Sequence, residues 1–131
     1  MIVPALHFCG DCKDAITLYE KAFNTKAHIV ITNSQFSPDE CGDDQIAHAE
    51  MILCGQRVLL NDRFGNKDKS PDMPVRLIVM FETADELLNC FEYFKDGSII
   101  VDPFEAVSYS KLFGNFIDPF GIGWGFMVES T

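Results

Sequence analysis

The sequence predicts an α+β fold built from two successive β-α-β-β-β modules. The same order of elements occurs twice at an offset of about 72 residues, which makes Asp14 of the first helix correspond to Glu86 of the second. A length of 131 residues suits one domain that buries about two-thirds of its unfolded surface. The 47% content of hydrophobic residues, with 12 phenylalanines, supports a packed interior. We therefore expect a single domain with module 1 at about residues 1–62, a linker at 63–73 and module 2 at about 74–131.

Hydrophobic periodicity and turn residues define the elements of module 1. Asp11 is the expected N-cap of the first helix, because a short acidic side chain can accept hydrogen bonds from the first free backbone N–H groups. The predicted elements are a strand at 2–8, a helix from Asp11 to Asn24-Thr25, a strand at 27–32, a polar loop at 33–44, and a hairpin of 45–54 and 57–62 that turns at Gly55-Gln56.

Module 2 repeats this order with clearer local signals. Thr83 followed by Glu86 is a capping box, which predicts that the second helix begins there and ends near Gly97. The segment Asp118-Pro119-Phe120-Gly121 has the residues of a type I turn at its first, second and fourth positions. The predicted strands of this module are 74–82, 98–102, 109–117 and 121–128.

A four-stranded sheet with its helix on one face leaves the other face uncovered. We expect the two modules to form a curved mixed sheet around a shared cavity. Such a cavity is the default place for a small-molecule site.

Charge and apolar-run length exclude several classes of function. The chain has 10 basic and 20 acidic residues, a net charge of −10, which disfavours nucleic-acid binding. Its apolar runs are far shorter than the ~20 residues of a membrane-spanning helix, and its N-terminus lacks the pattern of a signal peptide. The five cysteines are an odd number, so we expect free thiols and a cytoplasmic location.

Polar side chains of three strands are candidates for the cavity. Along strand 46–53, the alternation of residues turns His48 and Glu50 away from the apolar, helix-facing side. If Leu60 faces the cavity, so does Asp62, and Arg76 joins them from the next strand. Such a cluster could bind an anionic or carbonyl group through Arg76 and move a proton through His48 or Glu50. The same residues could instead form ion pairs that only satisfy buried charge.

Trp124 allows two interpretations, and the Cys9-Gly10-Asp11-Cys12 segment allows three, namely a redox pair, half of a metal site, and incidental thiols. Trp124 is either a core residue under the second helix or a stacking platform for a ligand. A C-x-x-C segment before a first helix is typical of thiol-disulfide oxidoreductases, and a helix N-terminus can lower the pKa of a thiol. Asp11 between the thiols opposes a thiolate, and three strands follow the helix, so we expect incidental thiols.

The sequence resembles the PhnB-like branch of the vicinal oxygen chelate superfamily, which includes glyoxalase I and the bleomycin-resistance proteins. The resemblance implies paired β-α-β-β-β modules, a cavity between their sheets and commonly a homodimer, but no particular reaction. It covers nearly the whole chain and is carried by Pro4-Ala5-Leu6-His7-Phe8, Gly10, Asp14-Ala15-Ile16, Tyr19, Ala22-Phe23, Ala47-His48-Ala49-Glu50, Gly55, Leu60-Asn61-Asp62, the segment from Phe113 to Gly121, and Trp124.

Metal-dependent members of this superfamily hold a divalent ion with four His, Glu or Gln side chains. The corresponding positions here fall on Pro4, at or next to Leu60, on Arg76 and on Gly125. None of these is a usual metal ligand. We therefore expect neither a catalytic metal nor another cofactor.

The resulting hypothesis is a small-molecule binding protein whose activity stays open. As an enzyme it would be a metal-free isomerase, lyase or proton-transfer catalyst that uses His48 and Glu50, with Arg76, Asp62, Leu60 and Trp124 at the substrate. The alternatives are a protein that sequesters a drug or metabolite, a metal-dependent lyase or isomerase of the glyoxalase type, and a C-x-x-C oxidoreductase. The expected partners are a small molecule and a second copy of the chain, with no nucleic acid and no membrane.

Overall fold

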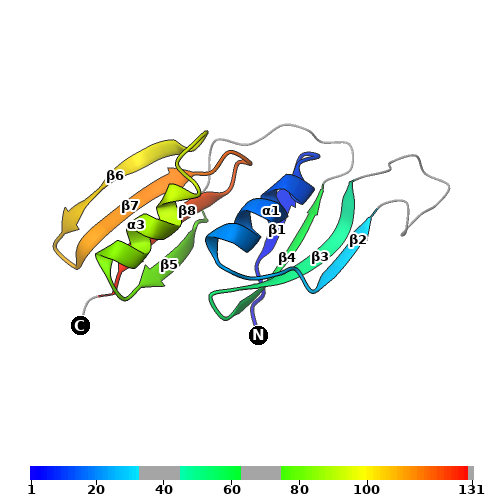
Figure 1. The fold of residues 1–131 in the computed structure, drawn as a ribbon, viewed down its shortest axis with the longest axis horizontal. Coiled ribbons are helices and arrows are strands. Elements are labelled where there is room, and N and C mark those ends of the chain that lie inside the picture. The colour runs from blue at the N-terminus through cyan, green and yellow to red at the C-terminus, as the bar shows by residue number, and fades with distance from the viewer. Residues whose placement is uncertain (33–44, 63–74, 130–131) are drawn as a thin grey trace. The chain divides into compact units, whose positions relative to one another are not determined.

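The computed structural model describes residues 1–32, 45–62 and 75–129. It divides into two compact units, unit 1 (Met1–Lys69) and unit 2 (Ser70–Thr131), shown in Figure 1. The predicted loop at 33–44 and the predicted linker at 63–73 lie outside the described residues.

Unit 1 has the predicted β-α-β-β-β order. Its four strands form a mixed sheet in the order β1-β4-β3-β2, in which β1 and β4 are parallel and the other neighbouring pairs are antiparallel. The elements of this unit are β1 (Ala5–Phe8), α1 (Cys12–Ala22), β2 (Ile29–Thr32), β3 (Ile46–Leu53) and β4 (Gln56–Asp62).

The core of unit 1 lies between α1 and one face of this sheet. Alternation along each strand sends every second side chain to that face. The ring of Phe8 on β1 contacts the ring of Tyr19 on α1, with 6.3 Å between ring centroids. The buried side chains of this core are those of Leu6, Phe8, Cys12, Ala15, Ile16, Tyr19, Ile46, Ala49, Met51, Leu53, Val58 and Leu60.

Unit 2 repeats the topology of unit 1. Its sheet has the order β5-β8-β7-β6, again with a parallel outer pair, β5 and β8, and antiparallel pairs elsewhere. The elements of this unit are β5 (Leu77–Phe81), α3 (Ala84–Glu92), β6 (Ile99–Val107), β7 (Ser110–Ile117) and β8 (Gly123–Val128).

Aromatic side chains fill the core between α3 and its sheet. Phe94, which follows α3, contacts Phe116, Trp124 and Phe126, with ring centroids between 5.4 and 5.6 Å apart. Phe104 reaches from the edge strand β6 to Phe91 on α3, at a centroid distance of 4.8 Å. Aromatic pairs of this kind contribute about 0.5–1.5 kcal/mol each beyond the area that they bury.

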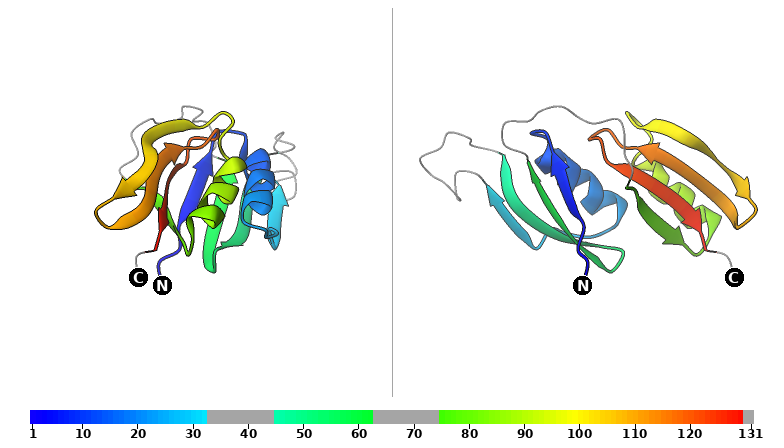
Figure 2. Two further views of the ribbon diagram at one scale, coloured as in Figure 1. Left: turned by 60° about the vertical axis from the view of Figure 1, so that its left-hand side comes forward. Right: turned by 180° about the vertical axis from the view of Figure 1, so that it is seen from behind.

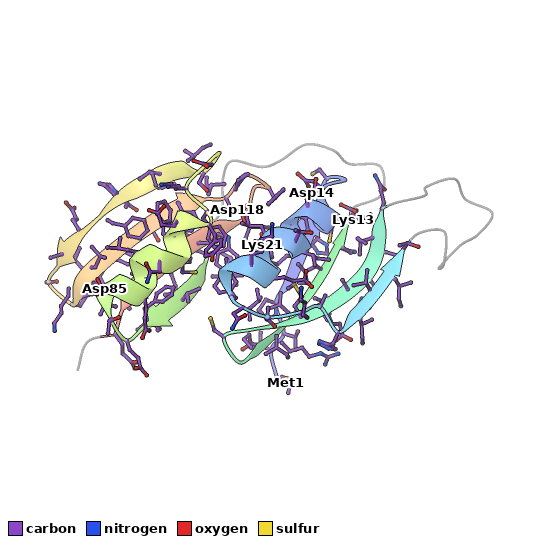
Figure 3. The ribbon with its side chains drawn as sticks, in the orientation of Figure 1. Met1, Lys13, Asp14, Lys21, Asp85 and Asp118 are labelled. Carbon is purple, nitrogen blue, oxygen red and sulfur yellow. The ribbon has the colours of Figure 1, made fainter. Side chains whose placement is uncertain are left out.

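Local signals located the start of both helices, whereas α3 ends at Glu92, five residues before the predicted end near Gly97. The side chain of Thr83 accepts a hydrogen bond from the backbone N–H of Glu86, which confirms the predicted capping interaction. Asp14 and Lys21 lie in the first and last turns of α1, and Asp85 lies in the first turn of α3, each where its charge suits the helix dipole (Figure 3). The Asp118–Gly121 turn also forms, with the Gly121 N–H donating to the Asp118 carbonyl at 3.0 Å.

Two further predicted details were wrong. The hairpin of β3 and β4 turns at Cys54-Gly55, because both residues adopt positive φ angles of 51° and 81° and the last ladder pair is Leu53 with Gln56. Strand β6 extends to Val107, five residues beyond the predicted end at Asp102. No helix of the described residues is long and apolar enough to cross a membrane.

Candidate functional site

Each sheet carries its helix on one face only. Seen from behind, the strands of each sheet lie in front of their helix, so the helix-free face is turned to the viewer (Figure 2, right). We call these surfaces the open face of unit 1 and the open face of unit 2. Two polar side chains on these faces have little exposure, Glu50 at 5% in unit 1 and Asn115 at 6% in unit 2. The open faces are therefore the places to examine for binding chemistry.

A charged cluster lies on the open face of unit 1. The Nε of Arg57 on β4 donates to Oε1 of Glu50 on β3 at 2.6 Å, and the Arg57 guanidinium also forms an ion pair with that oxygen. The other carboxylate oxygen, Oε2, lies 3.8 Å from Nε2 of His48. The strands explain the pairing, because Arg57 lies opposite Ile52 and is thus a diagonal neighbour of Glu50.

The guanidinium controls the charge of Glu50. The hydrogen bond and positive charge of Arg57 lower the pKa of the Glu50 carboxyl from its ordinary value of 4.5, against the opposing effect of burial, and His48 and His28 lower it further. A carboxylate with a lowered pKa is a poor proton acceptor near neutral pH. His48 and Glu50 lie on the face opposite the helix, as their alternation with Ala49 and Met51 predicted, but their place in a shared cavity stays a prediction. Proton transfer through Glu50 loses support.

Leu60 and Asp62 lie on the opposite face from the one predicted. Leu60 pairs with Ala49, so both point to the helix-facing side, where Leu60 is 1% exposed. Asp62 is also buried there. Its Oδ1 accepts hydrogen bonds from the backbone N–H groups of Gly10 and Cys12 at 2.8 and 3.0 Å, and its Oδ2 accepts one from Ile46 at 2.9 Å.

Asp62 therefore performs the capping role that the sequence suggested for Asp11. The Asp11 side chain makes no cap hydrogen bond to α1; its Oδ1 accepts instead from the backbone N–H of Cys9 at 3.3 Å. The free N–H of Cys12, at the start of the helix, is satisfied by the Asp62 carboxylate from the end of β4. Asp62 holds α1 and β3 to β4 and is not oriented toward a ligand on the open face.

The open face of unit 2 has a polar centre at Asn115 on β7. Its Nδ2 donates to Oδ2 of Asp102 on β6 at 2.8 Å. On the other side, Asn115 pairs with Gly125 of β8, which in turn pairs with Ile78 of β5. A Cβ atom added at Gly125 would lie 2.7 Å from Asn115 Oδ1 and would overlap Ile78 Cδ1. The glycine therefore allows the side chains of Asn115 and Ile78 to occupy the place where any other residue would have its Cβ.

Arg76 immediately precedes β5, in step with Ile78 and Met80, whose side chains are about half exposed on the open face of unit 2. This agrees with the predicted direction of its side chain. Its Nε atom is buried and has no hydrogen-bond partner among residues 1–32, 45–62 and 75–129. His48 and Glu50 belong to unit 1 and Arg76 to unit 2, so their predicted convergence in a shared cavity stays a prediction.

Trp124 takes the core role rather than the ligand-stacking role. It is 1% exposed, contacts Phe94, and donates its indole N–H to Oδ2 of Asp118 at 2.9 Å. Oδ1 of the same carboxylate accepts from the backbone N–H groups of Phe120 and Ile122. Asp118, labelled in Figure 3, thereby ties the turn before β8 to the core of unit 2.

The C-x-x-C segment has poor geometry for redox chemistry. Cys9 and Cys12 are both free thiols. Burial raises the pKa of the Cys12 thiol far above its ordinary value of 9.0, and the negative charges of Asp62 and Asp11 raise it further. Because the thiolate is the reactive form, this environment opposes the nucleophilic role that an oxidoreductase would require.

The positions that hold the metal in metal-dependent members of the superfamily do not suit a divalent ion here. Pro4 uses its carbonyl to accept from the N–H of Leu59, and Gly125 has no side-chain donor. Leu60 is apolar and faces α1, so the position next to it on the open face is Asn61, whose Oδ1 lies 2.5 Å from Nδ1 of His7. Arg76 adds a positive charge. Within the part of the chain that is described, no three His, Cys, Asp or Glu side chains gather as a metal-binding group would require.

Two functional candidates were missed by the sequence analysis. Arg57 could have been found from its place across the hairpin from Glu50, but only with the turn located at Cys54-Gly55. Asn115 is the single polar side chain between Phe113 and Ile117, which is an unusual composition for a central strand.

No family model matches the sequence. Protein YjdN of Escherichia coli is 23% identical over an alignment that covers 92% of this chain and 90% of the relative. Among solved structures, a PhnB protein from Bacillus cereus superposes with a TM-score of 0.84 at 23% identity, covering 97% of this chain and 98% of that one. A glyoxylase/bleomycin resistance protein/dioxygenase domain from Frankia superposes with a TM-score of 0.70 at 18% identity, covering 98% and 96%.

These likenesses extend over nearly the whole of each chain and agree with the repeated β-α-β-β-β topology. The chain has a glyoxalase/bleomycin resistance-like fold, as the resemblance of its sequence implied.

Proposed function

We propose that this protein belongs to the PhnB-like branch and binds a small organic molecule on the open faces of its sheets, without a resident divalent metal. The observation that carries the proposal is the presence of nearly buried polar side chains, Glu50 and Asn115, on the two faces that no helix covers. Polar groups of restricted exposure among apolar neighbours are typical of small-molecule sites.

Binding is favoured over proton-transfer catalysis by the state of the charged cluster. Arg57 lowers the pKa of the Glu50 carboxyl, which weakens the expected general base. The Glu50–Arg57 pair instead presents a fixed, polar surface with an exposed guanidinium. Sequestration of a drug or metabolite therefore fits this site better than turnover.

Native mass spectrometry of the purified chain tests the proposal. We expect a complex with an organic compound, either co-purified or taken from a chemical library, that persists after dialysis against a chelator. Glu50→Gln should leave the fold intact and change the affinity for the bound compound. The unsubstituted protein should not convert that compound into a product.

Two results would contradict this proposal. One is the absence of any bound compound across a broad library, combined with unchanged thermal stability in its presence. The other is turnover of a bound compound that is lost in Glu50→Gln at unchanged affinity, which would establish the catalytic alternative. Thr17→Ala, at an exposed position on α1, serves as the matched control because it lies on the helix side of unit 1.

A further inference from the structure

Two buried polar atoms lack a hydrogen-bond partner among the described residues, Nε of Arg76 and Oδ1 of Asn115. Folded proteins leave few such atoms, because a buried donor or acceptor without a partner loses its hydration and gains nothing in return. One is a donor and the other an acceptor, and both belong to unit 2. A ligand that supplies the complementary acceptor and donor would satisfy both.

The two side chains lie on the same open face. Asn115 and Ile78 flank Gly125 from opposite sides of β8, and Arg76 precedes Ile78 by two residues on the same side of β5. Both Asn115 Oδ1 and Ile78 Cδ1 lean into the space that a Cβ at Gly125 would occupy. Ile78 is 49% exposed, so its side chain can turn aside when a ligand enters.

The orientation of the Asn115 amide is fixed by its neighbour. Asp102 is a carboxylate and can only accept, so the amide must present its NH₂ group to Oδ2 of Asp102. Oδ1 is consequently held as an acceptor next to Gly125. It needs a donor from the ligand, such as a hydroxyl or an N–H group.

Arg76 requires the opposite chemistry. Its guanidinium is positive at all accessible pH values and has no carboxylate partner among the described residues. A partly buried cation without a counter-charge favours an anionic oxygen. The chain as a whole carries a net charge of −10, which repels anions. The Arg76 guanidinium is a local positive charge that can attract one, because its buried Nε has no partner among the described residues.

We propose that the open face of unit 2 binds an oxyanion that carries a hydrogen-bond donor on a neighbouring atom, with the oxyanion on Arg76 and the donor on Asn115 Oδ1. The 2-hydroxy carboxylates are the simplest members of this class. This inference rests on the proposed function and names the group that its ligand presents to unit 2. Gly125 has no side chain, which lets Asn115 Oδ1 lie over the backbone of β8.

The test is an NMR titration of the full chain with three probes that differ by one group. L-Lactate has both the carboxylate and the donor, propionate lacks the hydroxyl, and methyl lactate lacks the anionic charge. We expect lactate to shift the side-chain signals of Arg76 Nε–H and Asn115 Nδ2–H₂ with millimolar affinity. Each of the other probes should bind about tenfold more weakly or not at all, because each leaves one anchor unpaired.

Substitutions assign the two contacts. Arg76→Met should remove the preference for lactate over methyl lactate, and Asn115→Leu should remove the preference for lactate over propionate. Gly125→Ala should abolish binding, because its Cβ would overlap Asn115 Oδ1 and displace that anchor. Lys95→Met is the matched charge control, since Lys95 lies after α3, pairs with Glu92 and should leave all three affinities unchanged. Amide spectra verify that each variant is folded.

Equal binding of lactate and propionate, or lactate binding that survives Arg76→Met in a folded variant, would overturn the inference. So would the absence of any shift at Arg76 and Asn115 with all three probes. If native mass spectrometry nevertheless finds a bound organic molecule, the proposed function stands and only the assignment of its recognised group fails.

Discussion

The buried carboxylate of Asp62 offers the sharpest test of how unit 1 is held together. It is 3% exposed and accepts three backbone N–H groups, those of Gly10, Cys12 and Ile46. Asp62→Ala removes all three acceptors at once. Gly10 is exposed and can turn to water, but Cys12 and Ile46 are buried and cannot.

The expected loss of stability follows from those two buried donors. Each buried N–H group left without a partner costs about 1–3 kcal/mol, so Asp62→Ala should lower the free energy of unfolding by about 2–6 kcal/mol. Asp62→Asn retains Oδ1 for Gly10 and Cys12 but turns an NH₂ group toward the Ile46 N–H. It should cost about 1–3 kcal/mol, for the loss of that one bond.

Equilibrium urea unfolding followed by circular dichroism measures these differences, and hydrogen exchange at Cys12 and Ile46 assigns them. Asp14→Ala removes the same charge from an exposed site on α1 and should cost only about 0.3–1 kcal/mol through the helix dipole. If Asp62→Ala were as stable as Asp14→Ala, or if Asp62→Asn were as unstable as Asp62→Ala, the capping role would be refuted.

Three further predictions concern other sites. The pKa of the Glu50 carboxyl, measured by carbon NMR, should lie below 4.5. The Glu50–Arg57 ion pair should therefore stabilise the fold above that pH and lose this contribution as the pH falls through the lowered pKa. Arg57→Met should raise the pKa of Glu50, and an unchanged value would contradict the pairing. Cys12 should resist alkylation in the native protein at pH 8, as read by mass spectrometry, whereas rapid modification would restore the redox hypothesis. Gly114→Ala should cost about 1–3 kcal/mol in thermal unfolding, because its Cβ would lie 2.6 Å from the Phe104 ring, and a native-like melting temperature would show that this ring can move aside.

Features that depend on a few neighbouring residues could be predicted from the sequence. The cap at Thr83 and the turn from Asp118 to Gly121 each involve groups no more than four residues apart, and both formed as expected. The repeated order of elements was also visible, because each module carries its own alternating and helical hydrophobic patterns.

The predicted site failed where it depended on which face Leu60 and Asp62 occupy. The predicted turn would pair Leu60 with Met51, and the observed turn at Cys54-Gly55 pairs it with Ala49. Both partners are core residues, so either turn places Leu60 and Asp62 on the helix-facing side. The error was the assumption that Leu60 faces the cavity, which came from the metal positions of the superfamily. The link between Asp62 and the start of α1 joins residues about fifty positions apart, and no local pattern encodes it.

The most direct test of the account is a crystal structure of the protein purified without added ligand. The account predicts non-protein density on the open face of unit 2, beside Gly125, within hydrogen-bond distance of Arg76 Nε and Asn115 Oδ1. Density for water alone, or protein groups paired with both atoms, would contradict the claim that this face is a ligand site.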